Sequence, residues 1–281
     1  QYRRLHTQGL RVFVEFPVFH GRELWQRYPQ AHPVAADGSK LSPSDWYYGL
    51  NPSVPELRRD RLAAFQTLVS AGTIDGVWLD FVRWPGRWDT PQIDVVETSF
   101  DRPTLKRFLS EIAHQPHVPP TRDGLLAHSL IDQWHAWKRG LITSFVAEAR
   151  RVVDRLENPP ALGVFTVPWT PDEHDHALEQ IVCQDIDGIA AHVDMVSPML
   201  YQGICVKDIG WVVRTYAAIR TLAPAGTEVV PVIESPGVAG VSTHEFSWLY
   251  ERLAGEPDSP SIIVFKAPEA LRYPLPAGRH R

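Results

Sequence analysis

The sequence is poor in cysteine, has no excess of basic charge and contains no long hydrophobic run. Two cysteines, Cys183 and Cys205, are too few for a disulfide framework and lack the spacing of a zinc site. The 28 basic residues are outnumbered by 33 acidic ones, and the net charge of −5 argues against a nucleic-acid partner. No apolar run approaches the ~18 residues of a transmembrane helix, so we expect no membrane span.

Several nucleotide-binding and catalytic motifs are also missing. The sequence has no phosphate-binding P-loop, no glycine-rich dinucleotide fingerprint and no Gly-x-Ser-x-Gly elbow. We therefore expect no nucleotide cofactor and no serine hydrolase of that type. The chain begins with Gln1 and shows no signal-peptide pattern, so we expect a processed or trimmed form whose compartment the residues do not reveal.

Proline and tryptophan are abundant instead. The 281 residues include 25 prolines and ten tryptophans, and 44% of the chain is hydrophobic, which is enough to form a core. A disordered chain would contain few aromatic residues. This composition therefore predicts stiff, aromatic-lined loops on a regular scaffold.

Six short apolar stretches are predicted to be strands of a parallel sheet, because both of their faces are hydrophobic. They are residues 10–16, 76–81, 161–167, 195–201, 228–233 and 261–266. Helical periodicity lies between them, at 55–69, 104–112, 126–156, 209–222 and 244–253. Strands that alternate with helices predict an α/β fold.

The spacing of these strands refines the fold. The last four begin at residues 161, 195, 228 and 261, in steps of 33 or 34 residues. This spacing is typical of a (β/α)8 TIM barrel, whose eight units need ~250 residues. We predict one catalytic TIM-barrel domain over residues 1–281 that lacks the first one or two strands. An open doubly wound sheet is the alternative, because it requires no missing strands.

Asp80, at the end of the predicted strand 76–81, is the first candidate catalytic residue. Asp is disfavoured in strands and is costly to bury unpaired, so we expect its carboxyl group to face the barrel mouth. Arg83 could keep that carboxylate ionised. The alternative is an ion pair between Asp80 and Arg83 that merely closes the loop.

Glu234 is the second candidate, because it follows the apolar strand 228–233 and precedes a Pro-Gly turn. With two strands missing, the strands that end at Asp80 and Glu234 would be the fourth and seventh of a barrel, with both carboxylates in one mouth. Two facing carboxylates suffice for glycoside hydrolysis, one as nucleophile or base and the other as acid. A solvated strand end is the alternative for Glu234.

Further polar residues at strand ends are candidate substrate ligands. Tyr201 and Gln202 follow the strand 195–201 and could hydrogen-bond to sugar hydroxyls. Glu15 lies near the end of the strand 10–16. It either binds substrate or pairs with Arg83. Arg83 is itself a candidate substrate-binding residue.

Aromatic residues cluster on the same predicted loops. They are Trp46, Tyr47, Tyr48, Trp84, Trp88 and Trp169. Sugar rings stack on aromatic side chains, so we expect Trp84 and Trp169 above all to bind substrate, although a single Trp more often packs in a core.

Two other functions remain open at this point. A barrel with an aromatic mouth could bind carbohydrate without turnover, for which no paired acid and base is needed. A metal-dependent hydrolase could use His20, His174 or His192. Metal-dependent barrels usually take ligands from several strand ends, and the first strand is predicted to be missing from this chain. We therefore expect no metal and no cofactor.

One segment resembles a known family. Residues 75–85 read DGVWLDFVRWP and resemble the fourth-strand motif of hypothetical bacterial glycosyl hydrolases, the glycoside-hydrolase-family-10-like group and its relatives. Softer similarities lie at residues 50–53 (LNPS), 134–139 (WHAWKR) and 196–201 (VSPMLY). The resemblance extends from about residue 9 to residue 268 and covers the barrel from its third strand onward.

The resemblance implies a glycoside hydrolase similar to the α-amylase and α-galactosidase barrels, in which the Asp that ends the fourth strand is the nucleophile. Asp80 is then the nucleophile and Glu234 the acid/base of a retaining enzyme that cleaves a poly- or oligosaccharide. In the other large barrel clan the two roles are reversed. The resemblance also favours a secreted or cell-envelope location and a carbohydrate partner, and it leaves the oligomeric state open.

Overall fold

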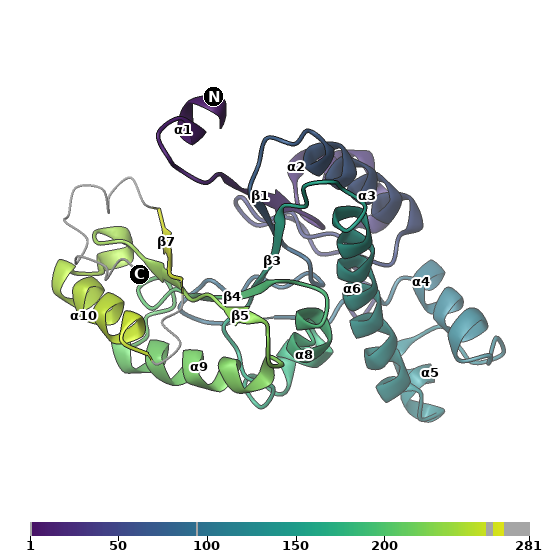
Figure 1. Cartoon of the computed structure of the whole chain (residues 1–281). Coiled ribbons are helices and arrows are strands. Elements are labelled where there is room, and N and C mark those ends of the chain that lie inside the picture. Colours follow the sequence, from purple (N-terminus) through teal and green to yellow (C-terminus); the bar gives the residue numbers. More distant parts are fainter. Residues whose placement is uncertain (1, 94, 257–260, 267–281) are drawn as a thin grey trace.

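A parallel sheet organises the chain in the computed structural model, which describes residues 2–93, 95–256 and 261–266 (Figure 1). Its strands lie side by side in chain order: β1 (Phe13–Pro17), β2 (Gly76–Asp80), β3 (Ala161–Thr166), β4 (Met195–Leu200), β6 (Val232–Glu234) and β7 (Ile263–Phe265). The short strand β5 (Glu228–Val229) also pairs with β4. All of these pairings are parallel.

This strand order identifies the fold. A doubly wound sheet reverses its strand order at a switch point, whereas the order here follows the chain. The strands and their outer helices form a curled half-barrel, so the fold is that of a partial (β/α)8 TIM barrel, as predicted (Figure 1). In the part of the chain that the structure describes, no helix is long and apolar enough to cross a membrane.

Each of the six predicted strand regions contains a strand, but one is interrupted. The region 228–233 forms β5 and β6 with a break at Pro231, which has no N–H group to donate to a sheet ladder. β6 then continues to Glu234, which places this carboxylate in the strand itself.

The helix α1 (Tyr2–His6) precedes the first strand and lies apart from the sheet (Figure 1). The other helices lie between strands in the chain. They are α2 (Arg22–Arg27), α3 (Pro55–Ser70), α4 (Arg102–Arg107), α5 (Arg122–Ala127), α6 (Ile131–Val153), α7 (Ala177–Gln180), α8 (Ile186–Ala190), α9 (Ile209–Leu222) and α10 (Thr243–Ala254). The predicted helix 126–156 is wrong as one element. Ser129 adopts a positive φ of 55° between α5 and α6, which no continuous helix allows.

Two clusters of buried side chains stabilise this arrangement. The larger one lies between the sheet and its helices and includes Leu79 of β2, Phe65 of α3 and Phe145 of α6. The smaller one surrounds Trp134 of α6, against which α4 and α5 pack at one end of that helix (Figure 1). α6 therefore joins the barrel to the α4–α5 region.

The concave face of the sheet carries the polar side chains. Successive residues of a strand point to opposite faces, so Phe16 of β1 packs in the core against the helices while Glu15 faces inward. In β2 the alternation puts Trp78 and Asp80 on the inner face. Glu15 is in register with Trp78, and Asp80 with Pro17. The carboxylates of β1 and β2 are thereby close together.

Candidate active site

A cavity of about 720 Å³ opens at the carboxyl ends of the strands, where the active sites of such barrels lie. Its polar lining is formed by Glu15, His20, Asp80, Arg83, Arg87, Asp89, Tyr201 and Lys266. Its aromatic lining is formed by Trp46, Phe81, Trp88, Phe165 and Phe265, together with the ring of Tyr201. The cavity therefore combines several carboxyl groups with flat apolar surfaces.

The backbone at the end of β2 holds the Asp80 carboxyl group in a defined orientation. Asp80 Oδ1 accepts a hydrogen bond of 2.6 Å from the N–H of Phe81, and Phe81 has a positive φ of 50°. A bulky residue rarely adopts this conformation, and such strain concentrates at functional sites. The N–H of Val18 donates to Asp80 O at 2.8 Å and fixes the strand end from the β1 side.

Glu15 and Asp80 form a carboxyl pair inside the cavity. Asp80 is only 8% exposed, whereas Glu15, on the neighbouring strand β1, is exposed and lines the same cavity. Burial and the negative charge of Glu15 raise the pKa of Asp80 to about 7. The positive charge of Arg83 lowers the pKa of Asp80, but by less than burial and Glu15 raise it. The expectation that Arg83 keeps Asp80 ionised is therefore wrong, because burial next to another carboxylate dominates.

Arg83 braces the cavity wall. Its Nη1 donates to Gly86 O at 2.6 Å and to the Tyr47 hydroxyl at 3.0 Å, and its guanidinium group lies over the rings of Tyr47 and Phe81. Because this network lies within the loop after β2 and the insertion after β1, Arg83 connects two of the predicted loops.

Glu234 is buried beside the cavity rather than in its lining. Its Oε2 accepts a 2.6 Å hydrogen bond from the N–H of Gly203, and its Oε1 accepts one of 3.2 Å from the N–H of Ile204. The side chain of Ile204 lines the cavity, and Glu234 is fully buried. Burial raises the pKa of Glu234, whereas the two amides and Lys266 lower it in part. Its role as acid/base stays a prediction.

Tyr201 reaches the cavity, whereas Gln202 does not. The Tyr201 ring is stacked between Trp88, at 5.5 Å, and Phe265, at 4.5 Å. Burial and the nearby carboxylates raise the pKa of its hydroxyl, which therefore stays protonated and can donate. Gln202 is 3% exposed and is absent from the described lining of the cavity, so its predicted contact with substrate is not supported by its position.

The predicted stacking role of Trp84 and Trp169 is corrected by the structure. Trp84 is fully buried and donates from Nε1 to the carbonyl of Lys138 at 3.1 Å, and Trp169 packs against His174. Neither contributes to the described lining of the cavity. Both indoles follow strands directly, where the loop turns back over the core. The aromatic surfaces of the cavity come instead from Trp46 and Trp88 of the loops after β1 and β2, from Phe81 and Tyr201 at strand ends, and from Phe165 and Phe265 in β3 and β7.

Sequence reasoning missed Lys266, at the end of the predicted strand 261–266, and two charged lining residues of the loop after β2, Arg87 and Asp89. Asp89 is partly buried, which raises its pKa. Arg87 donates to Asp45 at 2.8 Å, and its guanidinium group lies over the ring of Trp46. The only available signal for Arg87 and Asp89 was their place in the same Pro- and Trp-rich insertion as Arg83.

Two of the histidines named for a metal centre, His20 and His174, pack against aromatic rings. His20 stacks on Phe81 at 4.0 Å, and burial lowers its pKa to about 4, so it is neutral at physiological pH. His174 packs on Trp169. Within the described ranges, no group of three or more His, Cys, Asp or Glu residues could hold a metal ion.

No protein-family model and no curated protein sequence matches the chain. Its fold is similar to that of solved glycoside hydrolases. The PgaB (BpsB) glycoside hydrolase domain from Bordetella bronchiseptica superposes with a TM-score of 0.70 at 14% sequence identity. That similarity covers 97% of this chain and 75% of the PgaB domain.

Two β-galactosidases share the fold as well. The enzyme from Rahnella sp. R3 has a TM-score of 0.61 and 14% identity, covering 94% of this chain and 41% of that protein. The enzyme from the haloarchaeon Halorubrum lacusprofundi has a TM-score of 0.60 and 9% identity, covering 94% and 44%. The chain thus spans less than half of each β-galactosidase. At these identities the similarity establishes the fold alone.

Proposed function

We propose that this protein is a glycoside hydrolase that cleaves a glycosidic bond in a poly- or oligosaccharide, with Asp80 as its central catalytic carboxyl group. The observation that carries the proposal is the Asp80–Glu15 pair in an aromatic-lined cavity at the carboxyl ends of the barrel strands. The shared fold with solved glycoside hydrolases supports the same reaction class.

The environment of Asp80 favours the role of proton donor. A carboxyl group with a pKa of about 7 is largely protonated under mildly acidic conditions and can pass its proton to the glycosidic oxygen as the bond to the anomeric carbon breaks. The negative charge of Glu15 then lies beside the site and stabilises the positive charge that develops on the sugar ring. Asp80 as nucleophile, implied by the family resemblance, is the other assignment.

A second carboxylate must attack the anomeric carbon or activate water on the other side of the sugar ring. Glu234 is the residue predicted from the sequence, and Asp89 is a carboxylate of the cavity lining itself. With a retaining mechanism, the second group forms a glycosyl–enzyme ester, and water hydrolyses that ester with the deprotonated acid as base.

The test is a hydrolysis screen of the full chain against α- and β-linked polysaccharides, measured by release of reducing ends. Asp80→Asn should lower kcat by several orders of magnitude while ligand binding persists, because Asn is isosteric but can neither donate the carboxyl proton nor attack. Glu15→Gln, Asp89→Asn and Glu234→Gln, assayed in parallel, identify the second group.

The outcomes separate the alternatives. NMR of the first product shows whether the anomeric configuration is retained. Binding of a polysaccharide by the wild-type protein without turnover on any substrate would indicate a carbohydrate-binding barrel. Full activity in Asp80→Asn would contradict the proposal.

A further inference from the structure

The loop after β2 supplies much of the cavity wall but contains little regular structure. Arg83, Arg87, Trp88 and Asp89 of this loop line the cavity. Among the described residues of this loop, 81–93 and 95–101, no helix or strand is formed. Segments without a hydrogen-bonded ladder open easily unless other contacts hold them, so the position of these four side chains depends on anchors outside the loop.

Lys138 of α6 contacts both ends of this loop. Its Nζ lies 3.2 Å from Glu97 Oε1 and 4.8 Å from the centre of the Trp84 ring, and its main-chain carbonyl accepts the Trp84 Nε1–H at 3.1 Å. Nζ also donates to Gln180 O at 3.3 Å. Trp84 lies before the cavity residues 87–89 in the chain, and Glu97 lies after them. One side chain therefore connects the start and the end of the loop.

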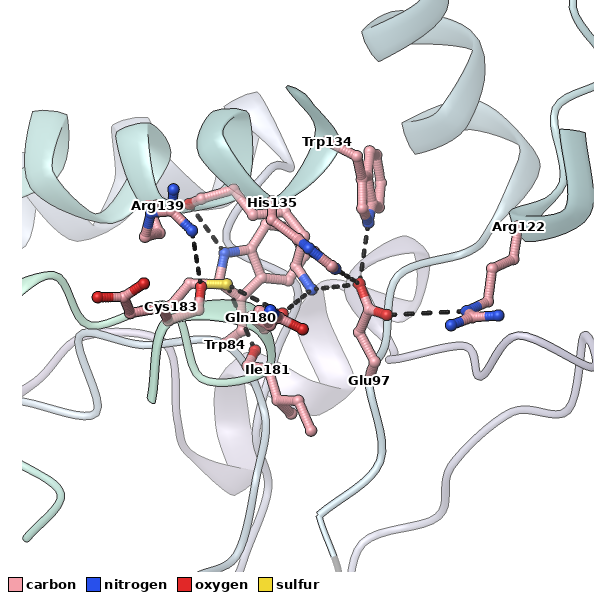
Figure 2. Close-up of polar contacts among 11 residues, drawn as sticks. Trp84, Glu97, Arg122, Trp134, His135, Arg139, Gln180, Ile181 and Cys183 are labelled. Atoms are coloured by element: carbon pink, nitrogen blue, oxygen red, sulfur yellow. Dashed lines mark hydrogen bonds and ion pairs between the residues drawn. The ribbon is translucent and has the colours of Figure 1, made fainter. Parts of the chain in front are cut away.

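Glu97 is surrounded by donors on the other side as well, as Figure 2 shows. Its Oε1 accepts hydrogen bonds of 3.1 Å from Trp134 Nε1 and from His135 Nε2, and Arg122 Nε lies 4.0 Å from Oε2. Burial by itself would raise the pKa of Glu97. The hydrogen bonds and positive charges of His135 and Lys138 have a larger effect and lower this pKa to about 2. Glu97 is therefore ionised at neutral pH.

The burial of this pair is the physical reason to look for a positional role. The Lys138 side chain is fully buried and that of Glu97 is 15% exposed. A buried ion pair is often no more stabilising than hydrophobic side chains of the same volume, because both ions lose their hydration. Its hydrogen-bonded contacts, however, restrict how the groups that it joins can be arranged.

We propose that Lys138 and Glu97 are positioning residues of the active site. From its place on α6, Lys138 contacts both Trp84 and Glu97 and thereby helps to fix the loop that presents Arg83, Arg87 and Asp89 to the cavity. The proposed placement of the loop rests on these contacts, whereas its effect on catalysis rests on the proposed glycosidase function. The assignment also explains the segment 134–139 (WHAWKR), because three of its six side chains face Glu97.

Hydrogen exchange of the full-length protein tests the placement without any assay of activity. We compare the wild type with Glu97→Gln and with the double variant Glu97→Gln/Lys138→Met, which leaves no unpaired buried charge and therefore folds even where the single variant does not. Amide exchange across residues 83–93 should be at least tenfold faster in the variants that fold.

Glu148→Gln is the matched control. Glu148 also lies on α6 and pairs with Arg58 of α3 at 3.2 Å, on a side of the helix that contributes nothing to the described cavity lining. This variant loses a helix–helix ion pair, so its exchange should increase near α3 and stay at the wild-type rate across 83–93. Unchanged exchange across 83–93 in the double variant would overturn the proposal, as would equal acceleration there in Glu148→Gln.

Kinetics on the substrate found in the screen give the second measurement. A displaced cavity wall should raise KM at least fivefold in the double variant, while the pH at which kcat/KM declines stays that of the wild type, because the Asp80–Glu15 pair is untouched. A shift of that pH or an unchanged KM would count against a positioning role. If the wild type hydrolyses no glycoside but 83–93 loosens as expected, the proposed function fails and the loop assignment stands.

Discussion

Glu15 and Asp80 lie on the neighbouring parallel strands β1 and β2, and both of their carboxyl groups line the same cavity at the carboxyl ends of the strands. Like charges this close cannot both ionise at low cost, so the pair holds a proton at a pH where a free carboxyl group would have lost it. Such a pair can supply a carboxylic acid and a carboxylate at the same pH.

The pH dependence of activity should reveal this proton. If Asp80 donates it, kcat/KM should fall as the pH rises through about 7, because the acid form disappears. Glu15→Gln removes the neighbouring negative charge and should move this decline to lower pH. A pH–rate profile of both proteins measures the shift, and identical alkaline limbs would show that Glu15 does not act on the titrating group.

Stability should depend on Asp80 over the same range. The folded-state pKa is raised above the unfolded value, so the contribution is fully present below about pH 4 and is lost as the pH rises through about 7. In the Asp80→Asn variant the side chain at this position is neutral at every pH, so no charge is buried as the pH rises. Urea unfolding at pH 5 and pH 8.5 should therefore show a smaller loss of stability in the variant than in the wild type.

Glu97 should produce the opposite dependence in acid. Its folded-state pKa of about 2 lies below the unfolded value, so its contribution is present above pH 4.5 and is lost as the pH falls from 4.5 to 2. The loss should be about 3 kcal/mol. Denaturant melts of the wild type and Glu97→Gln between pH 5 and pH 2 check this, and parallel curves for the two proteins would refute it.

Glu234→Gln should destabilise the protein. The Gln amide keeps one acceptor oxygen, but its NH2 group then faces a backbone N–H of Gly203 or Ile204, which leaves buried donors unpaired. Such a loss costs roughly 1–3 kcal/mol. Thermal melts measure it. A fall in kcat of three or more orders of magnitude in the folded variant would assign Glu234 the predicted acid/base role, and a smaller fall would assign it to holding the Gly203–Ile204 turn.

Trp46 should contribute to substrate binding. It lines the cavity and is 46% exposed, so a sugar ring can stack on its open face. Trp46→Ala should raise KM about five- to tenfold with little change in kcat, a stacking free energy on the order of 1 kcal/mol. Trp248→Ala is the control, because Trp248 is similarly exposed on α10 and is absent from the described cavity lining. Equal KM values for the two variants would contradict the stacking role.

The residue pattern alone predicted the scaffold and two catalytic candidates, of which Asp80 lines the cavity and Glu234 does not belong to its described lining. Apolar runs locate the strands, the last four at steps of 33 or 34 residues, because a parallel strand buried on both faces requires consecutive hydrophobic residues. Asp80 is recognisable because a carboxylate that ends such a run must face the barrel mouth or be paired. Both signals are local in the chain, so they can be recognised from the sequence alone.

Contacts between distant segments decided the rest. Glu234 also ends a buried strand, yet its surroundings depend on the Gly203–Ile204 turn, about 30 residues away in the chain. The roles of Trp84 and Trp46 were equally unreadable from sequence, because the path of a loop determines which indole packs inside and which meets the cavity. Sequence determined which residues end the strands. Only the tertiary structure decided which of them meet, because a pKa, a hydrogen bond and a cavity wall all depend on neighbours brought together by folding.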